Sequence, residues 1–376
     1  MNKITFFHCG DIHFDVPFTT LSSKLGLPKK RRQDIMEAFS KLIDLVKKEQ
    51  PDFLFIAGDL YEQEYSNLKT VNWINEKFCE IEDTKVILIA GNHDTETKNS
   101  FYKTLNWNDN VYFIGKDKEK ITFDEYNLDI YGIGFSLGQG QKMKLNDIEC
   151  ETNKNNVLLF HGDVDIDIGN RDYNALTSVA LESKGFDYIG VSHNHKYRND
   201  FGSRKIIYNA GSLEALGFDE EGEHGFIKGS ITNKKLTTQF ISLGYSKYKN
   251  IEIDIEDIET DVELIKQLKE ILTNKQGLYR VVLKGKKDID TIIDIKKIEK
   301  ILKEEVEFIR FKDKTQIKAN NNIENMQGGL KKAFISKITK QMEEDEANIA
   351  ILKQALIYGL QAIEDENINI TIGDEQ

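Results

Sequence analysis

Five short apolar runs in this chain are each followed by side chains that can bind a metal ion. The runs span residues 4–9, 53–57, 86–90, 157–160 and 188–192. Their brevity and their β-branched and aromatic residues are typical of buried strands. Since loops at the ends of neighbouring strands build sites on a rigid scaffold, we expect the polar residues that follow to lie together. These are Asp11, His13, Asp59, Asn92, His93, Asp94, His161, His193 and His195.

The residue types and their spacing predict a centre with two metal ions. Asp11 and His13 stand two residues apart, so in an extended segment both side chains leave on the same face and can hold one ion. His193 and His195 have the same spacing and could serve one ion each. Carboxylate, amide and imidazole ligands without thiolates favour Mn²⁺, Fe²⁺ or Zn²⁺ and argue against structural zinc. Asp59 is the candidate for a carboxylate that bridges two ions roughly 3.5–4 Å apart.

Each of these residues, taken alone, has a plainer explanation. A lone Asp-x-His is more often a turn at the end of a strand or a hydrogen-bonded histidine of the core. The series as a whole is different, because five of the seven histidines of the chain stand in it. That ordering favours metal chemistry over a set of unrelated structural residues.

The order of the motifs resembles the calcineurin-like metallophosphoesterase superfamily. In this chain the motifs are D-x-H, G-D, G-N-H-D, H-G and H-x-H. The segments at 15–18, 208–214 and 218–222 further resemble DNA-repair exonucleases of the SbcD and YhaO type, over about residues 1–245. Gly10 stands where alanine is common in the family, and Ser192 and Asn194 replace the glycine and isoleucine of its G-H-I-H motif. None of these departures removes a ligand.

The resemblance implies a role for each residue of the series. It places one ion on Asp11, His13, Asp59 and His195, and the other on Asp59, Asn92, His161 and His193. His93 then corresponds to the family's catalytic histidine, which stabilises the developing charge or protonates the leaving oxygen. Water activated by the two ions would attack phosphorus in line, without a covalent protein intermediate. Asp94 would orient the imidazole of His93, although capping a helix N-terminus is at least as good a role for it.

Composition limits the possible partners and location. The formal net charge of −12 opposes uniform binding to the DNA backbone, so any contact must rely on local cations. Lys196 and Arg198 follow His195 and are the candidates for phosphate contact, although a charged run is usually a solvated face. The three cysteines lack paired spacing, which suggests reduced thiols and a cytoplasmic location. No apolar stretch approaches the ~20 residues that a membrane span needs.

Between the motifs, the apolar periodicity predicts an α/β fold. Residues 31–49 and 67–82 each place apolar side chains on one helical face. In the family such helices help to form a homodimer, but packing against their own sheet would explain these faces equally well. The resemblance implies a nuclease domain, residues 1–245, of two packed sheets with helices on the outer faces. A β-α-β-α-β order over residues 246–318 predicts a small second domain, which resembles the domain that caps the active site and helps to select DNA ends.

The last segment, residues 319–376, is predicted to bind a partner. A polar linker at 319–322 and 328–329 precedes an apolar helical stripe from Leu330 to Ile363, and an acidic tail follows. A helix beyond a linker often buries such a stripe on another protein. In the family, the coiled coil of an SbcC-like ABC-type ATPase docks here. Packing on the chain's own capping domain or on a dimer mate is the alternative.

Three functions fit these features to different degrees. The favoured one is a Mn²⁺-dependent DNA exonuclease and endonuclease, the catalytic subunit of an SbcC–SbcD-like DNA-repair complex. A phosphodiesterase or phosphatase with a non-DNA substrate would use the same centre, but it needs neither the second domain nor the C-terminal helix. A scaffold that holds DNA ends without cutting them would not need His93.

Overall fold

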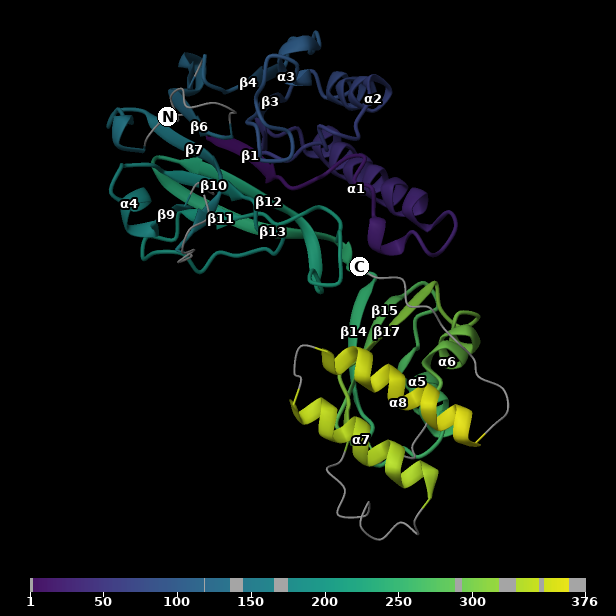
Figure 1. Cartoon of the computed structure of the whole chain (residues 1–376). Helices are drawn as coiled ribbons and strands as arrows, with labels where there is room; N and C mark the ends of the chain where they lie inside the picture. The colour runs from purple at the N-terminus through teal and green to yellow at the C-terminus, as the bar shows by residue number, and fades with distance from the viewer. Residues whose placement is uncertain are drawn as a thin grey trace. The chain divides into compact units, whose positions relative to one another are not determined.

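Two units make up the chain, and they divide after Lys249 (Figure 1). The units are Met1–Lys249 and Asn250–Gln376. The computed structural model describes residues 3–117, 119–135, 145–165, 175–287, 293–317, 329–344 and 348–364. Most of the predicted linker, residues 319–322 and 328, and the predicted acidic tail after Glu364 lie outside the described residues.

Two sheets packed face to face form the first unit, which confirms the predicted sandwich. The six-stranded sheet has the order β13 (Lys235–Tyr245), β12 (Glu223–Thr232), β1 (Ile4–Cys9), β2 (Phe53–Ile56), β3 (Lys85–Leu88) and β4 (Val111–Phe113). The five-stranded sheet has the order β11 (Ile207–Asn209), β10 (Tyr188–Ser192), β7 (Asn155–His161), β6 (Leu128–Ile133) and β5 (Lys120–Phe123).

The core between the sheets explains why the strands are apolar at nearly every position. Phe53 and Phe55 of β2 belong to the same buried cluster as Leu159 of β7 in the facing sheet. Leu54 and Ile56 alternate with them and are equally buried. A strand covered on both faces needs apolar side chains on both. All five strands of the predicted series are therefore present as central strands of the two sheets.

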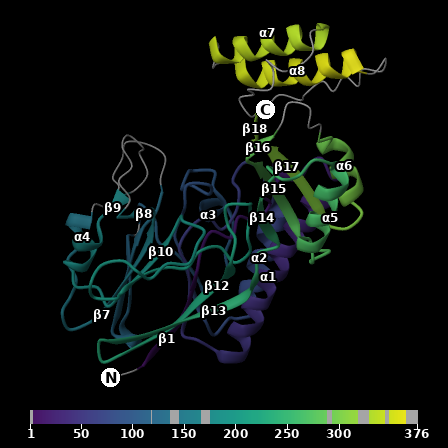
Figure 2. The same cartoon turned by 90° about the horizontal axis from the view of Figure 1, so that it is seen from below.

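Helices α1 (Leu27–Glu49) and α2 (Leu68–Cys79) lie on the side of the six-stranded sheet away from the five-stranded one (Figures 1 and 2). Helix α1 begins four residues earlier than predicted, because Pro28 suits a first helical turn. The side chain of Asn67 caps α2 by accepting from the backbone of Lys69 and Thr70. On the outer side of the five-stranded sheet, Leu181 of the short α4 (Ser178–Glu182) joins a second buried cluster.

The predicted apolar faces of α1 and α2 are buried within one chain. The face residues Ile35, Phe39, Leu42, Val71, Ile74 and Phe78 are at most 1% exposed. Packing within the chain, the alternative to a dimer contact, therefore accounts for both apolar faces. A homodimer through these helices remains a prediction.

Shorter elements complete the first unit. They are the 3-10 turns η1 (Thr19–Leu21), η2 (Asp124–Tyr126) and η3 (Leu145–Asp147), helix α3 (Phe101–Thr104), and the paired strands β8 (Asp163–Val164) and β9 (Ala175–Leu176). Most of them lie in the connections between the sheet strands.

The second unit contains the predicted alternation of strands and helices. Its three-stranded sheet consists of β14 (Tyr248–Asp254, whose first two residues belong to the first unit), β15 (Leu278–Lys284) and β17 (Phe308–Asp313), with α5 (Asp261–Ile271) and α6 (Ile295–Leu302) between them in sequence. Strands β16 (Lys286–Lys287) and β18 (Gln316–Ile317) form a separate pair. Helix α5 starts with a capping box between Thr260 and Glu263. Leu264 and Leu268 bury the face of α5 in a core with Val281 and Ile298.

Two helices, not one, carry the C-terminal apolar stripe. They are α7 (Leu330–Glu344) and α8 (Ile349–Glu364). Phe334 and Ile338 of α7 pack around the buried pair Ile335 and Leu356, so part of the stripe is buried between the two helices. Gly359 of α8 has no side chain, and this lets the ring of Phe334 of α7 lie close to it. A methyl group at position 359 would lie 2.0 Å from that ring. No helix among the described residues is long and apolar enough to cross a membrane.

Two of the departures named above, Gly10 and Ser192, lie against each other. A Cβ atom at Gly10 would lie 2.1 Å from the hydroxyl oxygen of Ser192 and 2.7 Å from its Cβ. An alanine at position 10 therefore needs a smaller residue at position 192. The absence of a side chain at Gly10 thus leaves room for the side chain of Ser192 between the neighbouring motifs.

Candidate metal centre

The parallel strands deliver the predicted residues to one rim of the sandwich. β1, β2 and β3 are parallel neighbours in one sheet, and β7 and β10 are parallel neighbours in the other. Each predicted motif starts at or just after the carboxyl end of one of these strands. The side chains then meet in two clusters that together contain Asp11, His13, Asp59, Asn92, His161, His193 and His195.

The first cluster contains Asp11, His13 and His195. The Nε2 atoms of the two histidines are 3.2 Å apart. Their Nδ1 atoms contact carboxylates, His13 at 2.7 Å from Glu62 and His195 at 2.8 Å from Glu220. A neutral imidazole that donates from Nδ1 presents a lone pair at Nε2. Two neutral rings would therefore face each other with lone pairs, and either a proton or a metal ion must lie between the two nitrogens, so this arrangement fits a metal ion that replaces a proton.

A buried oxygen strengthens the case for this first cluster. Asp11 is fully buried, and its Oδ2 accepts a hydrogen bond from the backbone N–H of His193 at 2.9 Å. Its Oδ1 is buried and has no hydrogen-bond partner among the described residues. Because a buried carboxylate oxygen without a partner is costly, the free oxygen fits a metal ligand.

The second cluster contains Asp59, His161 and His193, with the amide oxygen of Asn92 between the histidines. Asn92 Oδ1 lies 3.0 Å from His161 Nε2 and 3.0 Å from His193 Nδ1. His161 donates from Nδ1 to the carbonyl of Ala57 at 2.8 Å, so in the neutral ring Nε2 is an acceptor that faces the amide oxygen, as a metal ligand requires. The donor set of carboxylate, amide oxygen and imidazole suits a divalent transition metal.

Asp59 lies between the two clusters. Its Oδ2 is 3.3 Å from His161 Nε2 and 3.6 Å from His13 Nε2. Its Oδ1 accepts from the backbone N–H of His93 at 2.8 Å. This single carboxylate is thus placed to serve both clusters, the position that a bridging ligand requires.

Backbone conformation, and not an extended segment, brings Asp11 and His13 together. Both residues have left-handed φ values, 48° and 52°, and Asp59 has a φ of 50°. The Asp11 loop is held by hydrogen bonds from Ile12 and His13 to the carbonyl of Asp59. The expectation that an extended D-x-H would aim both side chains was therefore wrong in its geometry, although both side chains do enter one cluster. Such strain in non-glycine residues concentrates at functional sites.

Glu62, which the sequence analysis did not single out, connects the first cluster to His93. One oxygen of its carboxylate lies 2.7 Å from His13 Nδ1 and the other 2.9 Å from His93 Nδ1. Burial opposes ionisation of Glu62, but the hydrogen bonds from both histidines outweigh it and lower its pKa to about 2. The same hydrogen bond raises the pKa of His93. Because the His93 side chain is 47% exposed, its free edge is open to a substrate.

Asp94 holds two loops together. It does not orient the imidazole of His93, which is the role that the sequence had suggested. Its carboxylate accepts from the backbone N–H groups of Gly91, Asp59 and Leu60 and from the hydroxyl of Tyr102. It lies outside any helix, so the alternative of a helix cap does not describe it either. Asp94 instead joins the loop after β2 to the loop after β3. Glu62 occupies the orienting position beside His93.

The two candidate DNA contacts lie next to His195. Lys196 is exposed, and Asn194 accepts from its backbone N–H. Arg198 pairs with Asp200 at 3.0 Å and places its guanidinium 4.4 Å from the ring centroid of Phe201. Contact of either residue with phosphate remains a prediction.

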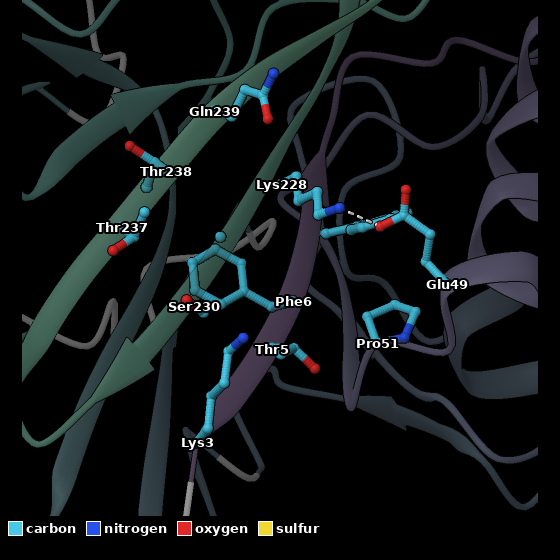
Figure 3. Close-up of a pocket in the computed structure, with 12 residues that line it drawn as sticks. Lys3, Thr5, Phe6, Glu49, Pro51, Lys228, Ser230, Thr237, Thr238 and Gln239 are labelled. Atoms are coloured by element: carbon cyan, nitrogen blue, oxygen red, sulfur yellow. Dashed lines mark ion pairs between the residues drawn. The ribbon is translucent and has the colours of Figure 1, made fainter.

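A hollow of about 290 Å³ lies away from these clusters (Figure 3). Its lining includes Lys3 and Thr5 at the beginning of β1, whereas the metal-binding motif follows the end of that strand. Lys228 in its wall pairs with Glu49. The hollow is therefore separate from the candidate centre.

The family follows from a match over the part of the chain that carries these motifs. A protein-family model described as calcineurin-like phosphoesterase matches residues 4–197, more than half of the 376 residues. The chain belongs to the calcineurin-like phosphoesterase family. This family uses divalent metal ions, and the two clusters are the groups that could hold them in this member.

Several relatives of this phosphoesterase extend the similarity beyond the matched region. The uncharacterized metallophosphoesterase YhaO of Bacillus subtilis is 23% identical over 360 residues, 88% of this chain and 86% of YhaO. The DNA double-strand break repair protein Mre11 of Sulfurisphaera tokodaii is 24% identical over 303 residues, 76% of this chain and 75% of Mre11. The SbcD component of the nuclease SbcCD of Staphylococcus saprophyticus is 25% identical over 246 residues, 57% of this chain and 64% of SbcD.

Replacing Glu62 by glutamine should weaken metal binding in the first cluster about 10–100-fold, because the amide cannot accept from both histidines as a charged group. Titration of the metal-free protein with Mn²⁺, followed by the resonance of free Mn²⁺, measures the change. Glu96→Gln is the matched control, since this buried carboxylate contacts Lys103 and the backbone of Lys116 instead. Equal affinities in Glu62→Gln and the unaltered protein would show that Glu62 does not position His13.

Metal binding should release protons near neutral pH. In the metal-free protein, burial lowers the pKa of His161 and His195, but Asp59 and Glu220 respectively outweigh it and raise both values to about 9. Both imidazoles are then protonated at pH 7 and must lose a proton to bind a metal. Affinity should therefore rise with pH up to about 9. Calorimetry in buffers of different ionisation enthalpy should give about two protons per molecule at pH 7, and buffer-independent heats would contradict this.

Proposed function

We propose that this phosphoesterase is a metal-dependent DNA nuclease, cutting phosphodiester bonds as an exonuclease and endonuclease. The observation that carries the proposal is the position of Asp59 between two clusters of imidazole and carboxylate ligands, with His93 half-exposed beside them. Relatives named for double-strand break repair and as part of a nuclease support DNA as the substrate. A phosphodiesterase acting on another substrate would share the centre but not this likeness.

The chain's own groups divide the work of hydrolysis. Two divalent cations, when bound, supply positive charge that favours ionised water and neutralises phosphate oxygens. Asp59 fixes the separation of the two clusters and, through the backbone N–H of His93, the position of that residue. Glu62 holds His93 by Nδ1 and favours its protonated form. His93 thus offers a proton at Nε2 to the leaving oxygen, a contribution typically worth about 10²–10⁴-fold in rate.

The finer features of the proposal follow the donor set and the family. Mn²⁺ is the proposed metal for both clusters, because mixed carboxylate, amide and imidazole ligands suit it. Lys196 and Arg198 are the proposed phosphate contacts beside His195. The small α/β region of residues 246–318 is proposed to cap the site and contact DNA. Its cellular setting is proposed to be the cytoplasm.

The proposed partner is an SbcC-like coiled-coil ATPase that binds helices α7 and α8. Although these helices bury part of their apolar stripe against each other, Leu330 remains 75% and Ile351 66% exposed. Exposed apolar side chains on a helix pair are suited to a coiled-coil partner. A homodimer of the first unit completes the proposed complex.

Purified protein with Mn²⁺ should degrade linear duplex DNA, and two variants should fail in different ways. Asp59→Asn should lose both cleavage and tight metal binding, because the shared carboxylate is gone. His93→Ala should keep two bound metals and lose about 10²–10⁴-fold in cleavage rate. Gel-resolved cleavage and metal analysis of the same samples measure both.

Asp129→Asn is the control for these variants. It alters a fully buried carboxylate at the opposite end of the five-stranded sheet from the metal clusters and should cleave normally. Hydrolysis of a small phosphodiester without any DNA cleavage, lost in Asp59→Asn, would keep the metal chemistry and reject DNA as the direct substrate. Loss of metal from His93→Ala would reject its proposed role.

Removing residues 323–376 should abolish binding to the coiled-coil ATPase and leave basal cleavage intact, because the metal clusters lie in the first unit. Analytical size exclusion of the purified ATPase with each form measures complex formation. Retained binding by the shortened chain would place the interface elsewhere.

A further inference from the structure

A buried arginine connects α1 to a loop that reaches the metal centre. Arg31 is 1% exposed. Its Nη1 donates to Asp34 at 2.5 Å, and its Nη2 donates to Glu214 at 2.6 Å and to the carbonyl of Ala215 at 2.9 Å. Burying a guanidinium is costly unless it is paired and hydrogen-bonded. These contacts therefore fix Arg31, and with it the segment that contains Glu214 and Ala215.

Aromatic rings hold the same segment from a second side. We name residues 210–222, between β11 and β12, the Glu220 loop. The guanidinium of Arg31 lies 5.3 Å from the ring centroid of Tyr248, and Tyr248 packs edge-on against Phe218 of the loop at 4.9 Å. Both rings are buried. Arg31 is thus bound to the Glu220 loop directly through Glu214 and indirectly through Tyr248.

The Glu220 loop ends at the metal centre. Glu220 Oε1 lies 2.8 Å from His195 Nδ1, and its Oε2 accepts from the backbone N–H of Leu216 at 2.9 Å. The carbonyl of Glu220 accepts from His224 Nε2 at 2.9 Å. The carboxylate therefore has little freedom as long as the loop keeps its shape, and the ring of His195 is held in turn.

We propose that Arg31 is a positioning residue for His195: it holds the Glu220 loop through Glu214 and Tyr248, and Glu220 aims the imidazole at the first metal cluster. The proposal rests on His195 being a metal ligand, as in the proposed function. Removing a hydrogen-bond partner of a ligating histidine typically lowers metal affinity about 10–100-fold. Arg31 reaches no predicted ligand itself, so its effect must pass through the loop.

Three variants separate the steps of this chain of contacts. Glu220→Gln weakens the last contact directly and is the reference. Arg31→Lys keeps a positive charge but loses the fork that bonds Asp34 and Glu214 together. Glu214→Gln keeps the size of the side chain and removes the charge that accepts from Nη2 of Arg31, so it tests the same contact if Arg31→Lys does not fold. Asp129→Asn, which removes the charge of a buried carboxylate that pairs with the partly exposed Lys120 and Lys154, controls for loss of a charged contact elsewhere.

The first measurement is made on the metal-free protein, so it does not depend on catalysis. Long-range nitrogen–proton correlation spectra of protein labelled at its seven histidines report which ring nitrogen of His195 carries a protected proton. We expect the Nδ1 proton of His195 to lose protection in Glu220→Gln, Arg31→Lys and Glu214→Gln. The signals of His161 should stay as they are in all three and in Asp129→Asn.

The second measurement is a two-site titration with Mn²⁺. We expect one of the two sites to weaken about tenfold or more in all three variants, with the other site unchanged. A folded Arg31→Lys or Glu214→Gln protein with an unaltered His195 signal and unaltered sites would overturn the proposal. Equal changes at His161 and His195 would overturn it as well, because they would show general loosening. If His195 responds in the spectra but no Mn²⁺ site does, the positioning stands and the ligand role in the proposed function falls.

Discussion

Lone pairs that face one another at hydrogen-bond distance are the constraint on which this structure depends. His13 and His195 approach to 3.2 Å through nitrogens that do not carry the proton in the neutral rings, and Asn92 faces His161 in the same way at 3.0 Å. Such contacts repel unless positive charge lies between them. The surrounding structure supplies the opposing force, since Glu62, Glu220 and the carbonyl of Ala57 hold each ring by its far side.

Backbone strain is part of the same arrangement. Asp11, His13, Asp59 and His193 all have positive φ values, which side chains other than glycine adopt only when their surroundings demand it. Around them, glycines provide the room: a Cβ at Gly58 would lie 2.4 Å from the ring of His161. The packing of the two sheets therefore stabilises these strained residues at the ends of the strands, each of which would alone prefer another backbone conformation.

The sequence predicted the strands well, and also that the polar residues after them lie together, because both depend on local pattern. Buried parallel strands are continuous apolar runs, and the polar residue that follows each is easily seen. The roles of Glu62 and Glu220 were not predicted because they depend on contacts with histidines 31 and 25 residues away in the chain. Glu220 lies in the segment 218–222, whose resemblance to the family gave it no role, and nothing local distinguishes Glu62 from other acidic residues. The error at Asp94 has the same origin: adjacency in sequence suggested His93 as its partner, whereas the fold gave it backbone donors from two loops. The break between α7 and α8 was missed because the apolar stripe continues across it.

The hydrogen bonds of Asp94 also bear on how far the loops around the metal clusters depend on the metal ions for their structure. Its carboxylate ties the loops after β2 and β3 together with four donors that belong to the protein. In proteins whose ligands gather only around the ion, loss of the metal means loss of the fold. Here the hydrogen bonds of Asp94 connect these two loops through groups of the protein alone. That connection does not involve the ion, so it stays the same whichever cation the cell supplies and the ligands prefer.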